Sequence, residues 1–327
     1  RLQKEVDWVF TGLGPIDSDP VLVNGTVYVT CRDRNLYAIG AEDGRRQFQV
    51  SLGIFGDTPA SVAVANEVVA VGTGRGEVIG VDALNGQILW RRNVGPAISA
   101  DLATSEDERL FLVTQDEGKI FALAPSTGEV IWSRQVAATP GTGVDVAGSL
   151  VYAGSYDNRA LTATKVEDGS PAWEAALPGP TATRPVVRGA YALLGSDDFS
   201  VYVVDVYTKK RIARLSTKGM VKARPVIVAK DVYFGSTDGA FYCYGLRGEG
   251  GMKWRRPLGA PIVAEAAIGR EHLYVGVTNG TLYCIGRATG TTQWTFTTKD
   301  KIVSRPLVAD GKIYVTSMDG CLYALSE

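Results

Sequence analysis

Charged residues recur at one position of a repeating pattern, directly before short apolar segments that often open with proline, as in "RPVVR" and "RPLVA". Six of the eight residues at this position are charged, and they lie about 41 residues apart: Asp19, Ser61, Asp101, Gly143, Arg184, Arg224, Glu265 and Arg305. Lys222 lies two residues before Arg224, so both side chains share one face of an extended strand. Guanidinium groups donate paired hydrogen bonds to carboxylates and phosphates, which makes Arg184, Arg224 and Lys222 candidates for an anion site.

The order of these charges leaves two interpretations open. The sign alternates from Arg224 through Glu265 and Arg305 to Asp19, as in a ring of mutual ion pairs. Arg184 has no acidic neighbour at the same position, so it would join a positive wall opposite an acidic side that consists of Asp19, Asp57 and Asp101. The charges therefore either bind an anionic ligand or form a purely structural ring, in which Arg184 turns aside toward Asp145 or Asp157.

The cysteines and the single histidine are interpreted as structural. Cys243 and Cys284 share one phase of the repeat on neighbouring sheets, which pack about 10 Å apart and too far for a disulfide. Whether Cys31 and Cys321 form a disulfide is left open, because they lie near one face but in different phases. His272 lies in a hairpin turn, and with one histidine in the chain neither a histidine-based triad nor a histidine-rich metal site is expected.

The glycine cluster "VGTGRGEVIG" at residues 71–80 resembles a phosphate-binding loop. A dinucleotide fingerprint requires a helix after the glycines, whereas "EVIGVDA" reads as a strand. The cluster is therefore predicted to be a turn between two strands.

The elements that position these residues follow from the aromatic spacing. The six tryptophans Trp8, Trp90, Trp132, Trp173, Trp254 and Trp294 are separated by one or two multiples of about 41 residues. Phe48 and about Ala213 occupy the two remaining positions of the same phase. An internal repeat of this period indicates a solenoid, a propeller or an array.

Each repeat contains four short apolar segments separated by turns such as "VNG", "TDG" and "TNG", and the fourth segment carries the aromatic residue. Four strands joined by hairpins form one antiparallel sheet, and no stretch has a helical period. Such sheets bury both faces when they pack around an axis, which predicts an all-β, eight-bladed propeller. The whole chain, 1–327, is then one propeller domain with blades at about 17–53, 54–95, 96–137, 138–179, 180–219, 220–259, 260–300 and 301–327, the last completed by 1–12.

The last repeat, "KIVSRPLVADGKIYVTSMDGCLYALSE", has three strands and lacks the fourth. The N-terminal "KEVDWVFTG" matches the fourth strand "GTTQWTFTT" of the seventh repeat and has no first three strands. We therefore expect residues 5–11 to pair beside 319–326 and close the ring, so that the junction has no free edge.

The phrases "YAIGAEDGRRQF", "VIGVDALNGQILW" and "FALAPSTGEVIW" resemble the repeat of pyrroloquinoline-quinone (PQQ) type propellers over essentially the whole chain. The fifth repeat departs from it, with neither glycine nor tryptophan in "VVDVYTKKRIA". This quinoprotein-like family includes PQQ-dependent dehydrogenases, assembly lipoproteins of the BamB type, and sensor domains of bacterial receptor kinases. The resemblance implies that the tryptophan of each repeat, and Phe48 at the same position, is a structural docking residue.

An enzyme is the minority interpretation. The dehydrogenases that the repeat resembles use adjacent cysteines, a metal site and an aspartate base, and none of these can be carried onto this sequence. We therefore predict no catalytic residue, no metal and no cofactor, and PQQ is not supported by any site residue.

The predicted function is a non-catalytic module that binds a small anionic ligand, a peptide or a protein, either as an extracytoplasmic sensor domain or as an assembly scaffold; the alternative is a PQQ-dependent oxidoreductase. A net charge of −1 excludes the basic excess typical of nucleic-acid binding, and no apolar run is long enough to cross a membrane. The extracytoplasmic location is implied by the resemblance alone. The ligand, the oligomeric state and what precedes Arg1, such as an anchor or a transmembrane helix, are left open.

Overall fold

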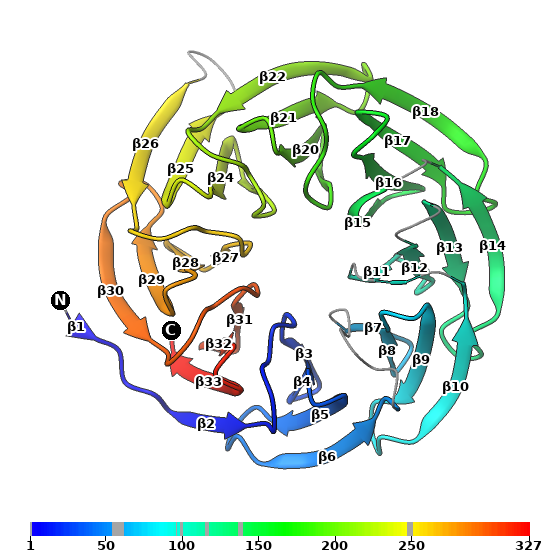
Figure 1. Ribbon diagram of the computed structural model, residues 1–327, viewed down its shortest axis with the longest axis vertical. Coiled ribbons are helices and arrows are strands. Elements are labelled where there is room, and N and C mark those ends of the chain that lie inside the picture. The colour runs from blue at the N-terminus through cyan, green and yellow to red at the C-terminus, as the bar shows by residue number, and fades with distance from the viewer. Residues whose placement is uncertain are drawn as a thin grey trace.

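Eight antiparallel sheets are arranged as blades around a central axis in the computed structural model, which describes residues 2–53, 62–95, 97–98, 101–114, 118–136, 140–246 and 251–327 (Figure 1). The described residues contain strands and turns and no helix, so none of them forms a helix that could span a membrane. The predicted all-β, eight-bladed propeller is confirmed.

Each blade contains four strands in sequential order, with the first strand innermost (Figure 1). Blade 1 consists of β3 (Val21–Val23), β4 (Thr26–Cys31), β5 (Asn35–Gly40) and β6 (Arg46–Ser51). Blade 2 consists of β7 (Ala63–Ala65), β8 (Val68–Gly72), β9 (Glu77–Asp82) and β10 (Ile88–Asn93). Blade 3 consists of β11 (Ala103–Thr104), β12 (Leu110–Val113), β13 (Lys119–Leu123) and β14 (Val130–Gln135). Blade 4 consists of β15 (Pro140–Ala147), β16 (Leu150–Ser155), β17 (Ala160–Lys165) and β18 (Pro171–Ala176).

The second half of the ring repeats this order. Blade 5 consists of β19 (Val186–Arg188), β20 (Tyr191–Ser196), β21 (Ser200–Asp205) and β22 (Lys210–Ser216). Blade 6 consists of β23 (Val226–Val228), β24 (Asp231–Gly235), β25 (Ala240–Gly245) and β26 (Met252–Pro257). Blade 7 consists of β27 (Ala267–Ile268), β28 (His272–Gly276), β29 (Thr281–Gly286) and β30 (Thr292–Thr297). Blade 8 consists of β31 (Leu307–Ala309), β32 (Lys312–Thr316), β33 (Cys321–Ser326) and, from the N-terminal end, β2 (Trp8–Thr11).

The two ends of the chain close the ring. Strand β2 pairs antiparallel with β33, with Trp8 opposite Ala324 and Thr11 opposite Cys321, as the sequence predicts. The sequence did not predict β1 (Leu2–Gln3), which pairs in parallel with β30 as a fifth strand of blade 7. Both ends therefore lie at the junction of blades 7 and 8 (Figure 1).

The core lies between the blades. Among the described residues, the buried apolar side chains form eight clusters, and each cluster fills the interface between two neighbouring blades. The alternation of side chains along a strand produces this arrangement, because each sheet presents an apolar surface to both neighbours.

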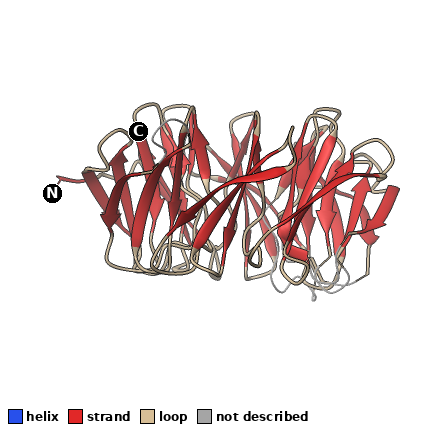
Figure 2. Cartoon of the chain, turned by 90° about the horizontal axis from the view of Figure 1, so that it is seen from above, coloured by secondary structure: helices blue, strands red, loops and turns tan. Residues whose placement is uncertain are grey.

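The turns divide the molecule into two faces (Figure 2). The links between blades and the turns between second and third strands lie at one end of the sheets, which we call the link face. The remaining turns lie at the opposite face, because successive turns of an antiparallel sheet alternate between its ends. The glycine cluster at 71–80 forms the turn between β8 and β9, as predicted, and it therefore belongs to the link face.

Candidate functional site

The residues at the start of the innermost strands converge at the mouth of the central channel on the link face. A cavity of about 180 Å³ is lined by all the charged members of the predicted set that the structure describes, namely Asp19, Asp101, Arg184, Lys222, Arg224, Glu265 and Arg305. Ser61 and Asp57 lie outside the described residues, and Gly143 provides no side chain. The charged residues that the sequence predicts at the channel mouth therefore lie together around one cavity. The ion pairs that they form with one another decide what the cavity can bind.

Arg224 is fully engaged within the protein. Its guanidinium contacts Asp145 at 3.0 Å and Glu265 at 3.5 Å. It also donates two hydrogen bonds to the backbone oxygen of Pro185. Its side chain is 14% exposed, so these contacts replace water rather than compete with it.

Arg184 turns toward Asp145, one of the two partners that the structural interpretation of the sequence left open for it. Its guanidinium lies 3.5 Å from Asp145 and 3.8 Å from Asp101. Asp145 is buried on β15, two residues beyond the position held by Gly143, and it also accepts a hydrogen bond from the backbone of Val187. The two-residue period of a strand places Asp145 on the same side as Gly143, so its carboxylate reaches the charges at the channel mouth.

Lys222 does not join a positive wall either. Its ammonium contacts Asp197 in the turn between β20 and β21 at 2.7 Å. The alternation of Arg224, Glu265, Arg305 and Asp19 is present as predicted, although the contacts of Arg305 are long, 3.7 Å to Asp19 and 4.0 Å to Glu265. The charged mouth is therefore largely compensated, which supports the structural interpretation of most of its members.

Asp19 is the exception among the carboxylates. Burial and the nearby charge of Asp101 raise its pKa to about 7, against the lowering effect of Arg305 and of the hydrogen bond from the Arg305 backbone. Burial likewise lowers the pKa of Arg184, and the charge of Arg224 lowers it further. The charge of the mouth therefore changes near neutral pH through Asp19.

A second feature of the link face is a group of exposed apolar side chains over blades 4 to 6, which we call the aromatic patch: Tyr156, Phe199 and Met220. They are 43%, 48% and 38% exposed, respectively. The Tyr156 hydroxyl donates to Asp197, which also binds Lys222. The backbone oxygen of Phe199 accepts a hydrogen bond from Thr217 in the link that carries Met220. These contacts connect the turns and the link that carry the three side chains.

Phe199 has an unusual backbone. Its φ is +67°, in the left-handed region, where blades 2, 3, 6, 7 and 8 have glycine at the equivalent turn position: Gly76, Gly118, Gly239, Gly280 and Gly320. Blades 1 and 4 have Arg34 and Arg159 there, also with positive φ, so Phe199 is the one apolar residue at this position. A bulky residue in this region is strained by about 1–3 kcal/mol. A strained and exposed phenylalanine is not explained by packing.

The predicted docking aromatics hold neighbouring blades together. Four indole nitrogens donate to a backbone oxygen in the next blade, in the pairs Trp8–Ala41, Trp90–Pro125, Trp132–Val166 and Trp254–Arg287. Phe48 and these four rings each lie on a glycine of positive φ, at Gly86, Gly44, Gly128, Gly169 and Gly290, where an added Cβ would come within 2.3 to 2.6 Å of the ring. The glycine of each turn is therefore required by the aromatic that it supports.

The remaining interfaces depart from this pattern. Trp173 packs near Tyr152 and faces a turn in which Lys209, with φ of +60°, stands in place of glycine. Trp294 is covered by the N-terminal segment, with the Lys4 ammonium 5.5 Å from its ring. Three arginines two residues beyond a tryptophan also donate to the glycine oxygen of the next blade, namely Arg92, Arg134 and Arg256. No pattern in the sequence predicts these hydrogen bonds between blades.

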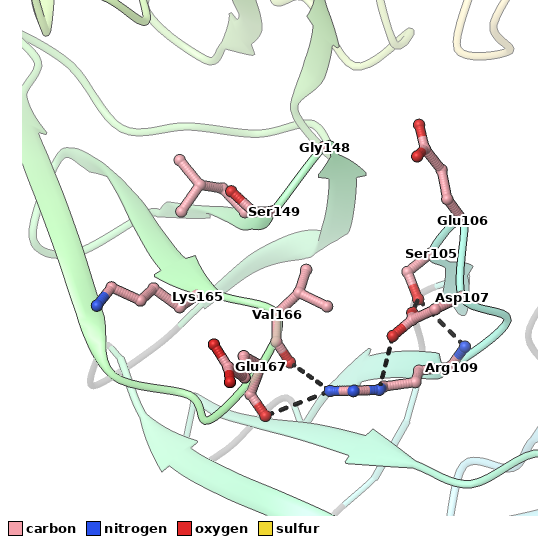
Figure 3. A pocket seen from close by; sticks show the side chains of 10 residues that line it. Ser105, Glu106, Asp107, Arg109, Gly148, Ser149, Lys165, Val166 and Glu167 are labelled. Atoms are coloured by element: carbon pink, nitrogen blue, oxygen red, sulfur yellow. Dashed lines mark hydrogen bonds and ion pairs between the residues drawn. The ribbon is translucent and has the colours of Figure 1, made fainter.

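A further cavity of about 500 Å³ lies on the opposite face between blades 3 and 4 (Figure 3). Arg109 at its floor already donates to the backbone oxygens of Val166 and Glu167 and contacts Asp107 at 3.0 Å. In the described part of the chain, no group of three His, Cys, Asp or Glu side chains is placed to hold a metal ion. The four cysteines are free, so Cys31 and Cys321 are unpaired here, and His272 is half-buried at the start of β28.

Eight blades, seven of which carry an aromatic residue at the docking position, form a ring closed by the N-terminal strand and define a β-propeller of the tryptophan-docking type. The chain belongs to the family described as outer membrane protein assembly factor BamB, whose family model matches residues 3–97, 75–261 and 247–327. Membership of this family agrees with the extracytoplasmic location that the resemblance implied.

Individual relatives carry the same name. The chain is 27% identical over 199 residues to an outer membrane protein assembly factor BamB of Burkholderia pseudomallei, covering 58% of this chain and 51% of that protein. It is 24% identical over 259 residues to one of Yersinia pestis, covering 73% and 64%. The match thus spans less than two thirds of either relative. The structure of BamB from Moraxella catarrhalis superposes with a TM-score of 0.82 at 16% identity, covering 99% of this chain and 100% of that one, which supports the fold.

Proposed function

We propose that this protein is a non-catalytic, extracytoplasmic scaffold that binds a partner protein during the assembly of outer-membrane proteins. The aromatic patch on the link face is the proposed contact surface. Family membership supports the assembly role, and the strained, exposed Phe199 is the single observation that carries the choice of surface. Aromatic residues are enriched at the energetic centres of protein interfaces, because they bury a large area for little conformational entropy.

The strain at Phe199 favours a role in binding over chance exposure. Single exposed apolar residues are common on protein surfaces and need no explanation. Here the segments that carry three of them are connected through Asp197 and Thr217, and one of the three occupies a backbone conformation that glycine would adopt without strain. Strained residues persist where function requires the side chain.

The other two interpretations are less well supported. Sensor domains and PQQ-dependent oxidoreductases also contain this repeat. No feature of the channel mouth or of the aromatic patch specifically supports either function. The sequence upstream of Arg1 distinguishes a sensor domain from an assembly scaffold, since a kinase domain would indicate the former.

The experiment is complementation with surface variants in a host that lacks the gene. Phe199→Ser combined with Tyr156→Ser should lower the amount of β-barrel proteins in the outer-membrane fraction, as the deletion does. Tyr207→Ser is the matched control, because Tyr207 is 76% exposed and lies at the opposite end of β21. A photoreactive amino acid at position 199 should cross-link to the partner protein.

Normal outer-membrane protein levels with the double variant would contradict the proposed surface. Normal levels in the deletion host itself would contradict the assembly role. Cross-links from position 207 as abundant as those from position 199 would show that the link face is not preferred.

A further inference from the structure

Two arginines at the channel mouth keep unused hydrogen-bond donors. Within the described residues, the side chains of Arg184 and Arg305 make ion-pair contacts of 3.5 to 4.0 Å but no hydrogen bond. The Nε atom of each is buried and lacks an acceptor. Arg224 differs, because its donors are satisfied by Pro185 and Glu265. A buried donor without an acceptor is costly, so these two guanidinium groups favour an additional acceptor.

Both arginines line the same space. Arg184 and Arg305 border the cavity of about 180 Å³ at the mouth and the adjoining cavity of about 400 Å³. The smaller cavity carries four cationic side chains, Arg184, Lys222, Arg224 and Arg305, against the three carboxyl groups of Asp19, Asp101 and Glu265. A small anion in this cavity would accept hydrogen bonds from forked donors on two sides.

Asp19 competes with such an anion for Arg305. Three charged groups face Asp19, each from the residues directly before the first strand of a blade: Asp101 before blade 3, Glu265 before blade 7 and Arg305 before blade 8. The corresponding residues before blade 2, 54–61, lie outside the described residues. The Asp19 carboxylate lies 3.7 Å from the Arg305 guanidinium. With the pKa of Asp19 at about 7, the carboxyl group is neutral in mildly acidic solution. Arg305 then keeps only Glu265, at 4.0 Å.

We propose that the channel mouth binds one small oxyanion between Arg184 and Arg305, and that protonation of Asp19 strengthens this binding. The site differs from the set Arg184, Arg224 and Lys222 that the sequence predicts, because Arg224 and Lys222 are engaged with Glu265, Pro185 and Asp197. It is independent of the aromatic patch and of the proposed scaffold role.

The test is calorimetric titration of the whole chain with sodium sulfate and, separately, with succinate, at pH 5.5 and pH 8.0. Sodium chloride keeps the ionic strength constant, because screening alone would alter the signal. Sulfate keeps two negative charges throughout this range, so a change of affinity with pH reports on the protein. We expect saturable binding of one anion that is about tenfold tighter at pH 5.5 than at pH 8.0. Uptake of up to one proton should accompany binding at pH 8.0, where Asp19 of the free protein is ionised, and little uptake should occur at pH 5.5. The comparison of sulfate with succinate distinguishes a tetrahedral oxyanion from a carboxylate as the preferred ligand.

Variants assign the effect to named groups. Asp19→Asn should bind at pH 8.0 as tightly as the unaltered protein does at pH 5.5, because asparagine stays neutral and still accepts the hydrogen bond from the Arg305 backbone. Arg305→Lys keeps the charge but loses the fork, and should weaken binding several-fold. Asp17→Asn is the matched control, since Asp17 pairs with Arg32 at 2.7 Å and should leave both affinity and pH dependence unchanged.

Three results would overturn the proposal. The first is the lack of saturable binding of either anion above the chloride control at pH 5.5. The second is equal affinity at the two pH values. The third is equal loss of affinity in Asp17→Asn and Arg305→Lys, which would indicate a general effect of surface charge.

Discussion

Five of the seven docking aromatics depend on a residue with no side chain in the following blade. The ring of Trp90 lies directly over Gly128, while its indole nitrogen donates to Pro125 and Arg92 donates to the Gly128 oxygen. One turn of four residues thus receives an aromatic ring and two hydrogen bonds from the neighbouring blade.

Replacing Gly128 by alanine should therefore be costly. The new Cβ would lie 2.3 Å from Trp90, and φ of +66° disfavours any side chain. We expect a loss of about 2–4 kcal/mol in the free energy of unfolding, measured by urea denaturation. Gly148→Ala is the control, because Gly148 has φ of +57° and nothing within 4 Å of its added Cβ, so only the backbone cost of about 1 kcal/mol should appear. Equal losses in the two variants would contradict the docking role of Gly128.

Replacing Phe199, in contrast to replacing Gly128, should not lower the free energy of unfolding. Phe199→Gly relieves the strain of a positive φ and removes a half-exposed ring, so stability should be unchanged or raised by up to about 1 kcal/mol. Differential scanning calorimetry measures the change. A loss of more than about 1 kcal/mol would show that the ring packs for stability, and would weaken the case for the aromatic patch.

The role of a residue could be predicted from the sequence where the residue recurs at one position of the repeat. The docking aromatics and the charges at the mouth share one phase, so comparison of the repeats finds them. Arg92 lies two residues from a marked position and has no predicted partner, because its contact with Gly128 is set by packing between blades. Asp145 was one of two partners left open for Arg184, and the packing of blades 4 and 5 decides between them. Phe199 was missed because a phenylalanine in a turn has no pattern of its own, and its φ is visible only in the structure.

At the scale of elements, the N-terminal strand β2 is the piece that completes the last sheet. Trp8→Ala should cost about 3 kcal/mol, because the ring fills the interface of blades 8 and 1 next to Tyr314. Trp8→Phe keeps most of this packing and loses the hydrogen bond to Ala41, so it should cost about 1 kcal/mol. Thermal unfolding of both variants measures the difference.

Deleting residues 1–11 should also leave the edge of β33 without a partner and promote aggregation, which light scattering after gel filtration would detect. An unchanged melting temperature and a monomeric protein after that deletion would contradict closure by β2.

Strands in which apolar and polar residues alternate were predictable from the sequence. Closure of the ring was predictable because the last repeat has three strands and the N-terminal segment provides one. Strand β1 was not, because two residues define no period and its partner, β30, lies almost 300 positions away. Its position is explained by Trp294, whose ring would otherwise lack the turn that covers the equivalent aromatics.

At the scale of the whole molecule, Asp19 should make stability depend on pH. Its pKa is raised from the ordinary value of 3.8 to about 7 in the folded protein. Between these values the folded state retains a proton that the unfolded chain has lost, so stability falls as the pH rises from 4 to 7, and the loss is complete above pH 7. Asp19→Asn lacks this loss and should be more stable than the unaltered protein at pH 8, by a difference on the order of 2 kcal/mol that vanishes near pH 4. Urea midpoints at four pH values measure the difference, and parallel curves for the two proteins would contradict it.

The ring as a whole should not turn over alcohols. The purified protein, mixed with PQQ, calcium and primary alcohols, is expected to reduce no artificial electron acceptor, because no residue of the sequence matches the site of the dehydrogenases that share its repeat. Boiled protein provides the background. Acceptor reduction above that background which chelation abolishes would establish the oxidoreductase alternative.

The pairing of β2 with β33 bears on where the polypeptide can be cut. Asp7 donates its backbone N–H to Ala324 and accepts from Ser326, so a short peptide could join the two ends and new ends could be opened elsewhere. A circularly permuted chain opened inside a blade would still share one sheet across the cut, whereas a chain opened in a link between blades would be held there by side chains alone. Because β2 and β33 belong to one sheet, backbone hydrogen bonds, rather than side-chain packing alone, hold the ring closed at blade 8.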